Sequence, residues 1–269
     1  MRAPARLRED GPLRATLVAI GLAVFGIAAT QFTTLPAFLL EPALQGTPTD
    51  ASIEARTMLL ILNFLGFVLA GGIYLSATDR GWSYVDLRMP TRRGWLYVAA
   101  GVVGSVVFFV AVSALVQLLS LPTAESQVMD FVGDDQTMVL VMILIVFFFN
   151  APAEEFLFRN VIQKRLYSAF SRMQAVVAAS AVFALVHFPV YTAYADSLGA
   201  TAISLSVVFG GSIIFGYLYA KTDNLVVPTV AHAAFNAFQF GLLYVALEYD
   251  IEEAQPAPSH AIDVVLALC

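Results

Sequence analysis

The chain has 269 residues, of which 59% are hydrophobic and 13% are charged, and its formal net charge is -6. An ordinary soluble domain is about 45–50% apolar and about 25% charged, and a fold of this size cannot hide so much apolar surface from water. The composition therefore indicates a protein that spans a bilayer several times and excludes nucleic-acid binders, disordered chains and disulfide scaffolds. The single cysteine, Cys269, has no partner for an internal disulfide.

The apolar stretches predict the elements. A transmembrane helix needs about 20 mostly apolar residues. In chain order, the stretches that qualify are residues 15–40, 57–77, 94–120, 137–163, 174–190, 198–220 and 224–247. We expect an all-α, polytopic transmembrane bundle of about seven spans over residues 15–247, preceded by an N-terminal segment 1–14 and followed by a polar tail 248–269. The first stretch could also be a cleaved signal peptide, but its length favours an anchor helix.

The basic residues give an independent indication of the topology. Lysine and arginine concentrate in the cytoplasmic loops of membrane proteins. Of the 14 basic residues, twelve lie in the N-terminal segment and in every second connection after it. The connections between these hold only Arg56. The remaining basic residue, Arg159, lies inside a predicted span. This alternation predicts a multi-pass protein of the cell membrane with its N-terminus inside and its C-terminus outside.

Residues 150–159 place charges where lipid is expected, in the sequence Asn-Ala-Pro-Ala-Glu-Glu-Phe-Leu-Phe-Arg. An ionisable residue at a helix centre in the membrane costs at least ~2.5–3.5 kcal/mol, which makes it a functional hypothesis. Glu155 and Arg159 are four residues apart and can pair on one helix face. Glu154 points about 100° away, without such a partner. Pro152 predicts a kink. The alternative interpretation is a buried Glu–Arg clasp between helices.

Two histidines lie in later spans. His187 ends the sequence Phe-Ala-Leu-Val-His, and a lone histidine of this kind is more often a packing residue than a catalytic one. His232 and Asn236 share a helix face. They are interpreted either as part of a functional site or as partners in a hydrogen bond between helices. The helical rise places Glu154, His187 and His232 ~15, ~20 and ~12 Å from the same membrane face. We therefore expect these groups to meet near mid-membrane.

Such a set is suited to hydrolysis. A carboxylate in an apolar site can take a proton from water, and a second histidine with an amide can stabilise an oxyanion. A different possibility is zinc, held by Glu154, His187 and His232 with one open position. No metal or other cofactor follows from the sequence alone, and no serine or cysteine nucleophile lies near these groups. His260, in the polar tail, is expected to be solvated.

The three motifs together resemble a known family. In order, they are Glu154-Glu155-x-x-x-Arg159, Phe183-x-x-x-His187 and His232-x-x-x-Asn236. They are similar to the signatures of the CAAX protease and bacteriocin-processing family (CPBP or Abi) of intramembrane endopeptidases, which includes the Ras-converting CAAX endopeptidase. The resemblance extends over about residues 78–240.

The resemblance implies a role for each residue. Glu154 would be the general base with His187 as its partner, His232 and Asn236 would stabilise the oxyanion, and Glu155 and Arg159 would support them. The implied substrate is a peptide or a membrane-anchored protein, with prenylated CAAX-type peptides among the options, and the mechanism is either glutamate-dependent or metal-dependent. The buried Glu and His residues also permit a proton-coupled transporter. The third alternative is a non-catalytic membrane scaffold.

Overall fold

The computed structural model describes residues 11–193 and 195–249, and within these residues it is helical without strands. Most of the predicted N-terminal segment and of the polar tail, including His260 and Cys269, lies outside the described residues. The described part contains six helices that are long and apolar enough to cross a membrane. They are α1 (Pro12–Leu40), α2 (Ile53–Ala77), α3 (Arg92–Leu118), a continuous helix Gln136–Leu166, α10 (Leu198–Thr222) and α11 (Val226–Glu248).

The outer surface of these helices is apolar. Leu39, Leu96 and Phe148 are 80%, 71% and 69% exposed, and many other large hydrophobic side chains are exposed beside them. Such a surface is unfavourable in water and is matched by lipid. The chain is therefore a multi-pass membrane protein.

The predicted fifth span, residues 174–190, is divided in the structure. Helix α8 (Arg172–Val186) has 15 residues, which reach about 22 Å, whereas the hydrocarbon core is about 30 Å thick. His187 ends α8, and Pro189 lies in the first turn of a second short helix, α9 (Phe188–Thr192). Six helices of the described residues are long and apolar enough to span a membrane, and the segment expected as a seventh is instead a shorter apolar helix followed by α9.

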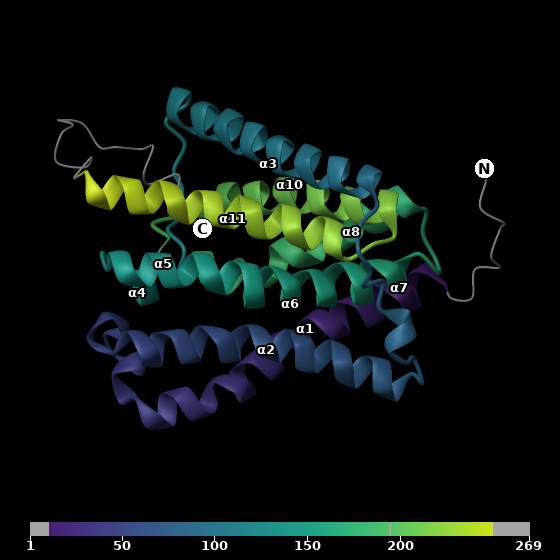
Figure 1. The fold of residues 1–269 in the computed structure, drawn as a ribbon, viewed down its shortest axis with the longest axis horizontal. Coiled ribbons are helices and arrows are strands. Elements are labelled where there is room, and N and C mark those ends of the chain that lie inside the picture. The colour runs from purple at the N-terminus through teal and green to yellow at the C-terminus, as the bar shows by residue number, and fades with distance from the viewer. Residues whose placement is uncertain (1–10, 194, 250–269) are drawn as a thin grey trace.

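The continuous helix Gln136–Leu166 occupies the middle of the bundle (Figure 1). In that view α1 and α2 lie on one side of it, and α3, α10 and α11 lie on the other. Every side chain from Phe156 to Gln163 is buried. A polar group on this helix is therefore surrounded by protein and not by lipid. The helix consists of α5 (Gln136–Ile145), η4 (Val146–Asn150), α6 (Ala151–Glu155), η5 (Phe156–Gln163) and α7 (Lys164–Leu166).

Short helices complete the connections at the ends of the bundle. They are η1 (Pro42–Gln45), η2 (Pro48–Asp50), η3 (Trp82–Tyr84) and α4 (Met129–Val132). At one end, Arg56 pairs with Asp135 at 2.9 Å and donates to the carbonyls of Phe131 and Val132. These bonds tie α2 to the segment that precedes the central helix.

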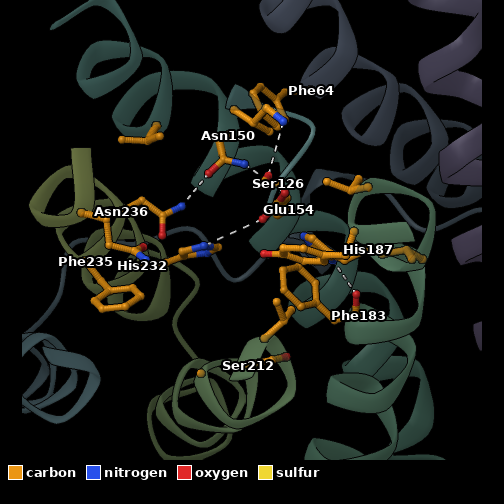
Figure 2. Close-up of a pocket in the computed structure, with 18 of the residues that line it drawn as sticks. Phe64, Ser126, Asn150, Glu154, Phe183, His187, Ser212, His232, Phe235 and Asn236 are labelled. Atoms are coloured by element: carbon orange, nitrogen blue, oxygen red, sulfur yellow. Dashed lines mark hydrogen bonds and ion pairs between the residues drawn. The ribbon is translucent and has the colours of Figure 1, made fainter. Parts of the chain in front are cut away.

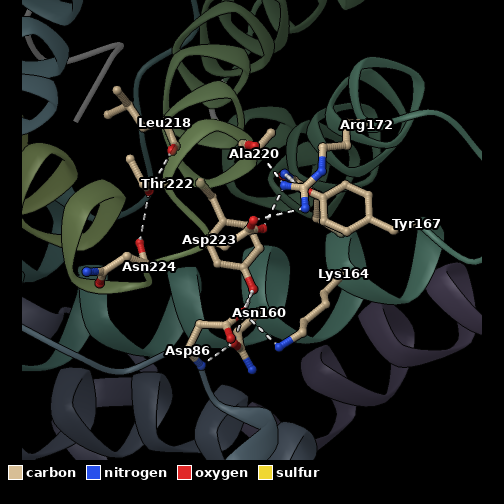
Figure 3. Close-up of polar contacts among 12 residues, drawn as sticks. Asp86, Asn160, Lys164, Tyr167, Arg172, Leu218, Ala220, Thr222, Asp223 and Asn224 are labelled. Carbon is tan, nitrogen blue, oxygen red and sulfur yellow. Dashed lines mark hydrogen bonds and ion pairs between the residues drawn. The ribbon is translucent and has the colours of Figure 1, made fainter. Parts of the chain in front are cut away.

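Most of the described basic residues in the connections lie at the opposite end. There the loop before α3 is fixed to the end of the central helix, because Lys164 donates to Asp86 at 2.7 Å and Tyr219 donates to the same carboxylate at 2.6 Å (Figure 3). Arg172 pairs with Asp223 at 2.6 Å. Burial raises the pKa of Tyr84 in this loop to about 12, although Arg80 opposes the shift. The fold thus separates a basic end from the Arg56 end.

Candidate active site

The central helix is distorted where its polar residues begin. The segment η4, Val146–Asn150, is π-helical, and the backbone N–H of Ala151 donates to the carbonyl of Val146, five residues earlier. Pro152, in the following turn, has no N–H to donate. Whereas the sequence predicts a kink at Pro152, the structure shows π-helical segments on both sides of α6. Such segments are often found at functional sites because they turn side chains out of the regular helical register.

Glu155 and Arg159 form the pair that their spacing predicts, and both side chains are completely buried. Arg159 Nε lies 3.0 Å from Glu155 Oε2, and Nη2 lies 3.3 Å from Oε1. The guanidinium also donates to Ser212 Oγ at 3.1 Å and lies 5.1 Å from the ring centre of Phe183. This two-point contact holds the Glu155 carboxylate as an ion in the protein interior.

Glu154 has a hydrogen-bond partner on its own helix. Asn150, one turn earlier, donates from Nδ2 to Glu154 Oε1 at 2.9 Å. Asn236 on α11 in turn donates to Asn150 Oδ1 at 3.0 Å. Glu154 is therefore held by an amide chain that crosses to α11, and one of its oxygens, Oε2, is left for other groups.

His232 lies between the two carboxylates. Its Nδ1 is 3.0 Å from Glu155 Oε1, and its Nε2 is 3.8 Å from Glu154 Oε2. The imidazole stacks on Phe215, with ring centres 4.5 Å apart and an angle of 16° between the planes. Because an ionised carboxylate can only accept a hydrogen bond, Nδ1 carries a proton, and Nε2 is the nitrogen that faces Glu154.

His187 is positioned by the end of α8. Its Nδ1 lies 2.8 Å from the carbonyl oxygen of Phe183, one turn earlier. A carbonyl accepts, so Nδ1 carries a proton here too, and Nε2 is free for a ligand. Among the described residues no hydrogen bond joins His187 to Glu154. In the view of Figure 2, Asn236, Asn150, Glu154 and His232 lie together, and His187 is on the other side of Glu154.

These side chains surround one cavity of about 330 Å³. Asn150, Glu154, His187, His232 and Asn236 all line it, whereas Glu155 and Arg159 lie behind the lining. Aromatic rings form much of the remaining wall, among them Phe183, Phe215 and Phe235. The cavity thus combines one available carboxylate, two imidazoles and several amides with a largely apolar surround, which is typical of a small-molecule or peptide site.

The donor set does not fit a metal ion in this arrangement. A structural or catalytic zinc needs at least three protein ligands about 2 Å from one point. Within the described residues no group of three His, Cys, Asp or Glu side chains lies close enough to hold one ion. Glu154, His187 and His232 share the cavity without forming such a group.

Three contributors to the site were not among the residues expected from the sequence. Asn150 stands four residues before Glu154, a spacing that permits the observed bond, so the sequence held a signal for it. Ser212 and Phe215 lie on α10 and contact Arg159 and His232, and nothing in their sequence surroundings indicates this.

Comparison with known proteins identifies the domain. Residues 136–238 match the family described as Type II CAAX prenyl endopeptidase Rce1-like. Neither the curated proteins nor the solved structures gave a match to the chain. The matched range begins with α5, ends within α11 and contains every residue of the three motifs. Residues 136–238 are therefore a domain of the Rce1-like type II CAAX prenyl endopeptidase family, a family of peptidases.

Proposed function

We propose that the chain is an intramembrane endopeptidase that hydrolyses a peptide bond of a membrane-anchored, prenylated substrate. The observation that carries this proposal is the cavity in which Glu154, His187, His232 and Asn236 come together inside a domain of a peptidase family. The apolar walls are suited to a substrate that reaches the site from lipid, and a cavity of this size accommodates a short stretch of extended chain.

In the proposed mechanism Glu154 is the general base. Asn150 holds one of its oxygens, so Oε2 is free to take a proton from a water molecule. In the proposal, His187 uses Nδ1 on the carbonyl of Phe183 and turns Nε2 to the cavity to accept a hydrogen bond from the same water. The hydroxide adds to the carbonyl carbon of the scissile bond. Glu154 then gives its proton to the leaving nitrogen as the C–N bond breaks.

His232 and Asn236 would stabilise the oxyanion of the tetrahedral intermediate. In this role His232 carries a proton on Nε2 in addition to the one on Nδ1. With Nδ1 bound to Glu155, that proton makes Nε2 a donor toward the cavity. Asn236 uses one amide hydrogen on Asn150 and keeps a second one for the substrate.

The proposal includes an orientation. We place the chain in the cell membrane with the basic end, marked by Lys164 and Arg172, on the cytoplasmic side, because basic residues are enriched there. A soluble protein that carries a prenyl group on its C-terminal region meets the membrane from this side.

The test is cleavage by the purified chain in proteoliposomes. The probe is a farnesylated peptide with a CAAX-type C-terminus, flanked by a fluorophore and a quencher, and mass spectrometry identifies the products. We expect the parent to release a single C-terminal fragment and Glu154→Ala to release none above background. Glu54→Ala, which removes an exposed carboxylate from the first turn of α2, serves as the matched control and should cleave like the parent.

Retained cleavage by Glu154→Ala would overturn the assignment of the base. A zinc chelator provides the second arm. Because the described donors do not form a three-ligand site, we expect activity to survive it, and loss of activity that added zinc restores would instead favour the metal-dependent mechanism.

A further inference from the structure

Several carboxamide side chains outside the family domain also line the active-site cavity, and two of them lie on the first two membrane helices. Gln31 lies on α1 and Asn63 lies on α2, and both helices are full membrane spans. Among residues 11–193 and 195–249, neither side chain has a hydrogen-bond partner. A carboxamide at membrane depth without a partner is costly, so a role beyond packing has to be considered.

Contacts between the helices place both amides at the height of the catalytic residues. Gly26 on α1 faces Leu157, because a Cβ added at this glycine would lie 2.8 Å from the Leu157 side chain. Helix α1 contacts α7, and Figure 1 shows the beginning of α1 beside α7, so α1 runs antiparallel to the central helix. Five residues further along α1, about 7.5 Å by the helical rise, Gln31 therefore lies level with the turn between Asn150 and Glu154.

Asn63 lies at the same level. Thr33, two residues after Gln31, donates to the carbonyl of Leu62 on α2 at 2.7 Å. The contact between α1 and α2 is further fixed by Gly66, where an added Cβ would lie 2.5 Å from the backbone of Thr30. These contacts hold the two helices together without either amide, so the amides are not needed for the packing of α1 against α2.

The chemistry of a carboxamide matches that of a peptide backbone. Each carboxamide has an N–H donor and a C=O acceptor, and so does each peptide unit. A substrate must be extended at the bond to be cut, and then its N–H and C=O groups have no internal partners. In a site surrounded by lipid these groups are satisfied only by the protein.

We propose that Gln31 and Asn63 form a subsite that binds the main chain of the peptide substrate next to the scissile bond. This inference rests on the proposed function and deepens it, because it assigns substrate binding to α1 and α2, outside the matched range 136–238. Both groups act by binding, and neither takes part in the chemical step.

The first experiment separates binding from chemistry. Gln31→Met and Asn63→Leu keep much of each side chain's volume and remove its hydrogen-bonding groups. In proteoliposomes with the farnesylated fluorogenic peptide, we expect each variant to raise KM about tenfold, since the substrate's buried groups lose a partner, and to change kcat little. Phe32→Leu is the control, because Phe32 is 70% exposed, adjoins Gln31 and does not line the cavity. Its KM should equal that of the parent.

The second experiment distinguishes contact with the substrate from an indirect effect on the fold. Peptides in which one backbone N–H near the scissile bond is replaced by an ester oxygen lack one donor. If an amide of the subsite accepts from that N–H, the ester raises KM for the parent but not further for the matching variant. The proposal would be overturned if the ester and the variant raised KM additively at every ester position. It would also be overturned if KM were unchanged in both variants.

Peptide binding tests the subsite separately from peptide cleavage, which tests the proposed function. If the parent cleaves no peptide, the proposed function fails, and the subsite is then judged by the Kd of the same peptide. Weaker binding by Gln31→Met and Asn63→Leu than by Phe32→Leu supports the subsite in that case, and equal binding by all three overturns it.

Discussion

Arg159 and Glu155 are buried together behind the cavity, and His232 depends on the same carboxylate. Replacing only the arginine leaves an uncompensated charge in the interior. We therefore expect Arg159→Met to lose about 3–5 kcal/mol of unfolding free energy, measured by chemical unfolding in detergent, together with cleavage activity.

The double variant Glu155→Leu with Arg159→Met is the control for this prediction. It removes both charges, so it should recover much of the lost stability. It should still be inactive, because His232 has lost the carboxylate that binds its Nδ1. A single variant as stable as the parent would contradict the role of this ion pair.

At the residue level, the sequence shows which groups are unusual but not how all of them are connected. The spacing of Glu155 and Arg159 predicts their pair because both lie on one helix. The contact of His232 with both carboxylates depends on how α11 packs against the central helix, which no spacing within one segment reports. The bond from Asn236 to Asn150 was missed for the same reason, whereas the bond from Asn150 to Glu154 lies within one helix at a spacing that permits it.

Helix α2 contains two glycines that differ in their surroundings. A Cβ added at Gly66 would collide with the backbone of Thr30 on α1, whereas a Cβ at Gly72 would meet nothing within 4 Å. We expect Gly66→Ala to separate the helices and lose about 1–3 kcal/mol of unfolding free energy. Gly72→Ala, the matched control, should be unchanged or up to about 1 kcal/mol more stable. Equal effects of the two variants would show that close approach of α1 and α2 is unimportant.

Asp135 joins the start of the central helix to α2. Burial of the carboxylate would raise its pKa, but hydrogen bonds from the backbone of Met138 and from Arg56 outweigh this effect and lower the pKa. A lowered pKa in the folded state means that the carboxylate stabilises the fold above its unfolded pKa and that this contribution is lost as the pH falls through the folded value.

The corresponding measurement is the unfolding free energy in detergent between about pH 7 and about pH 3. The parent should lose stability toward the acidic end, and Asp135→Asn should show a smaller loss over the same range and lower stability at neutral pH. Parallel curves for the two proteins would contradict the assignment.

At the level of elements, hydropathy predicts the helices well because lipid demands apolar outer surfaces and saturated backbone hydrogen bonds. The expected all-helical membrane protein is confirmed, and six helices of the described residues have the length and hydropathy of a full span. The division of residues 174–190 at His187 and the π-helical segments beside α6 could not be read from hydropathy. They change backbone hydrogen bonding without changing the apolar composition.

For the whole molecule, the separation of basic residues predicts its orientation in the membrane. In a Cys269→Ser background, Thr47→Cys places an exposed thiol in the connection between α1 and α2, and Lys221→Cys places one in the last turn of α10, at the basic end. A membrane-impermeant maleimide should label Thr47→Cys on intact cells and label Lys221→Cys only after permeabilisation. The reverse pattern would contradict a cytoplasmic basic end.

In the proposed mechanism Glu154 activates the water that cleaves the peptide bond. The most direct test is the single-turnover cleavage rate of Glu154→Gln with enzyme in excess over the farnesylated peptide. The glutamine can keep the bond from Asn150 but cannot take a proton, so we predict a rate at least about 100-fold below that of the parent, with unchanged peptide binding. A single-turnover rate equal to that of the parent would contradict the account.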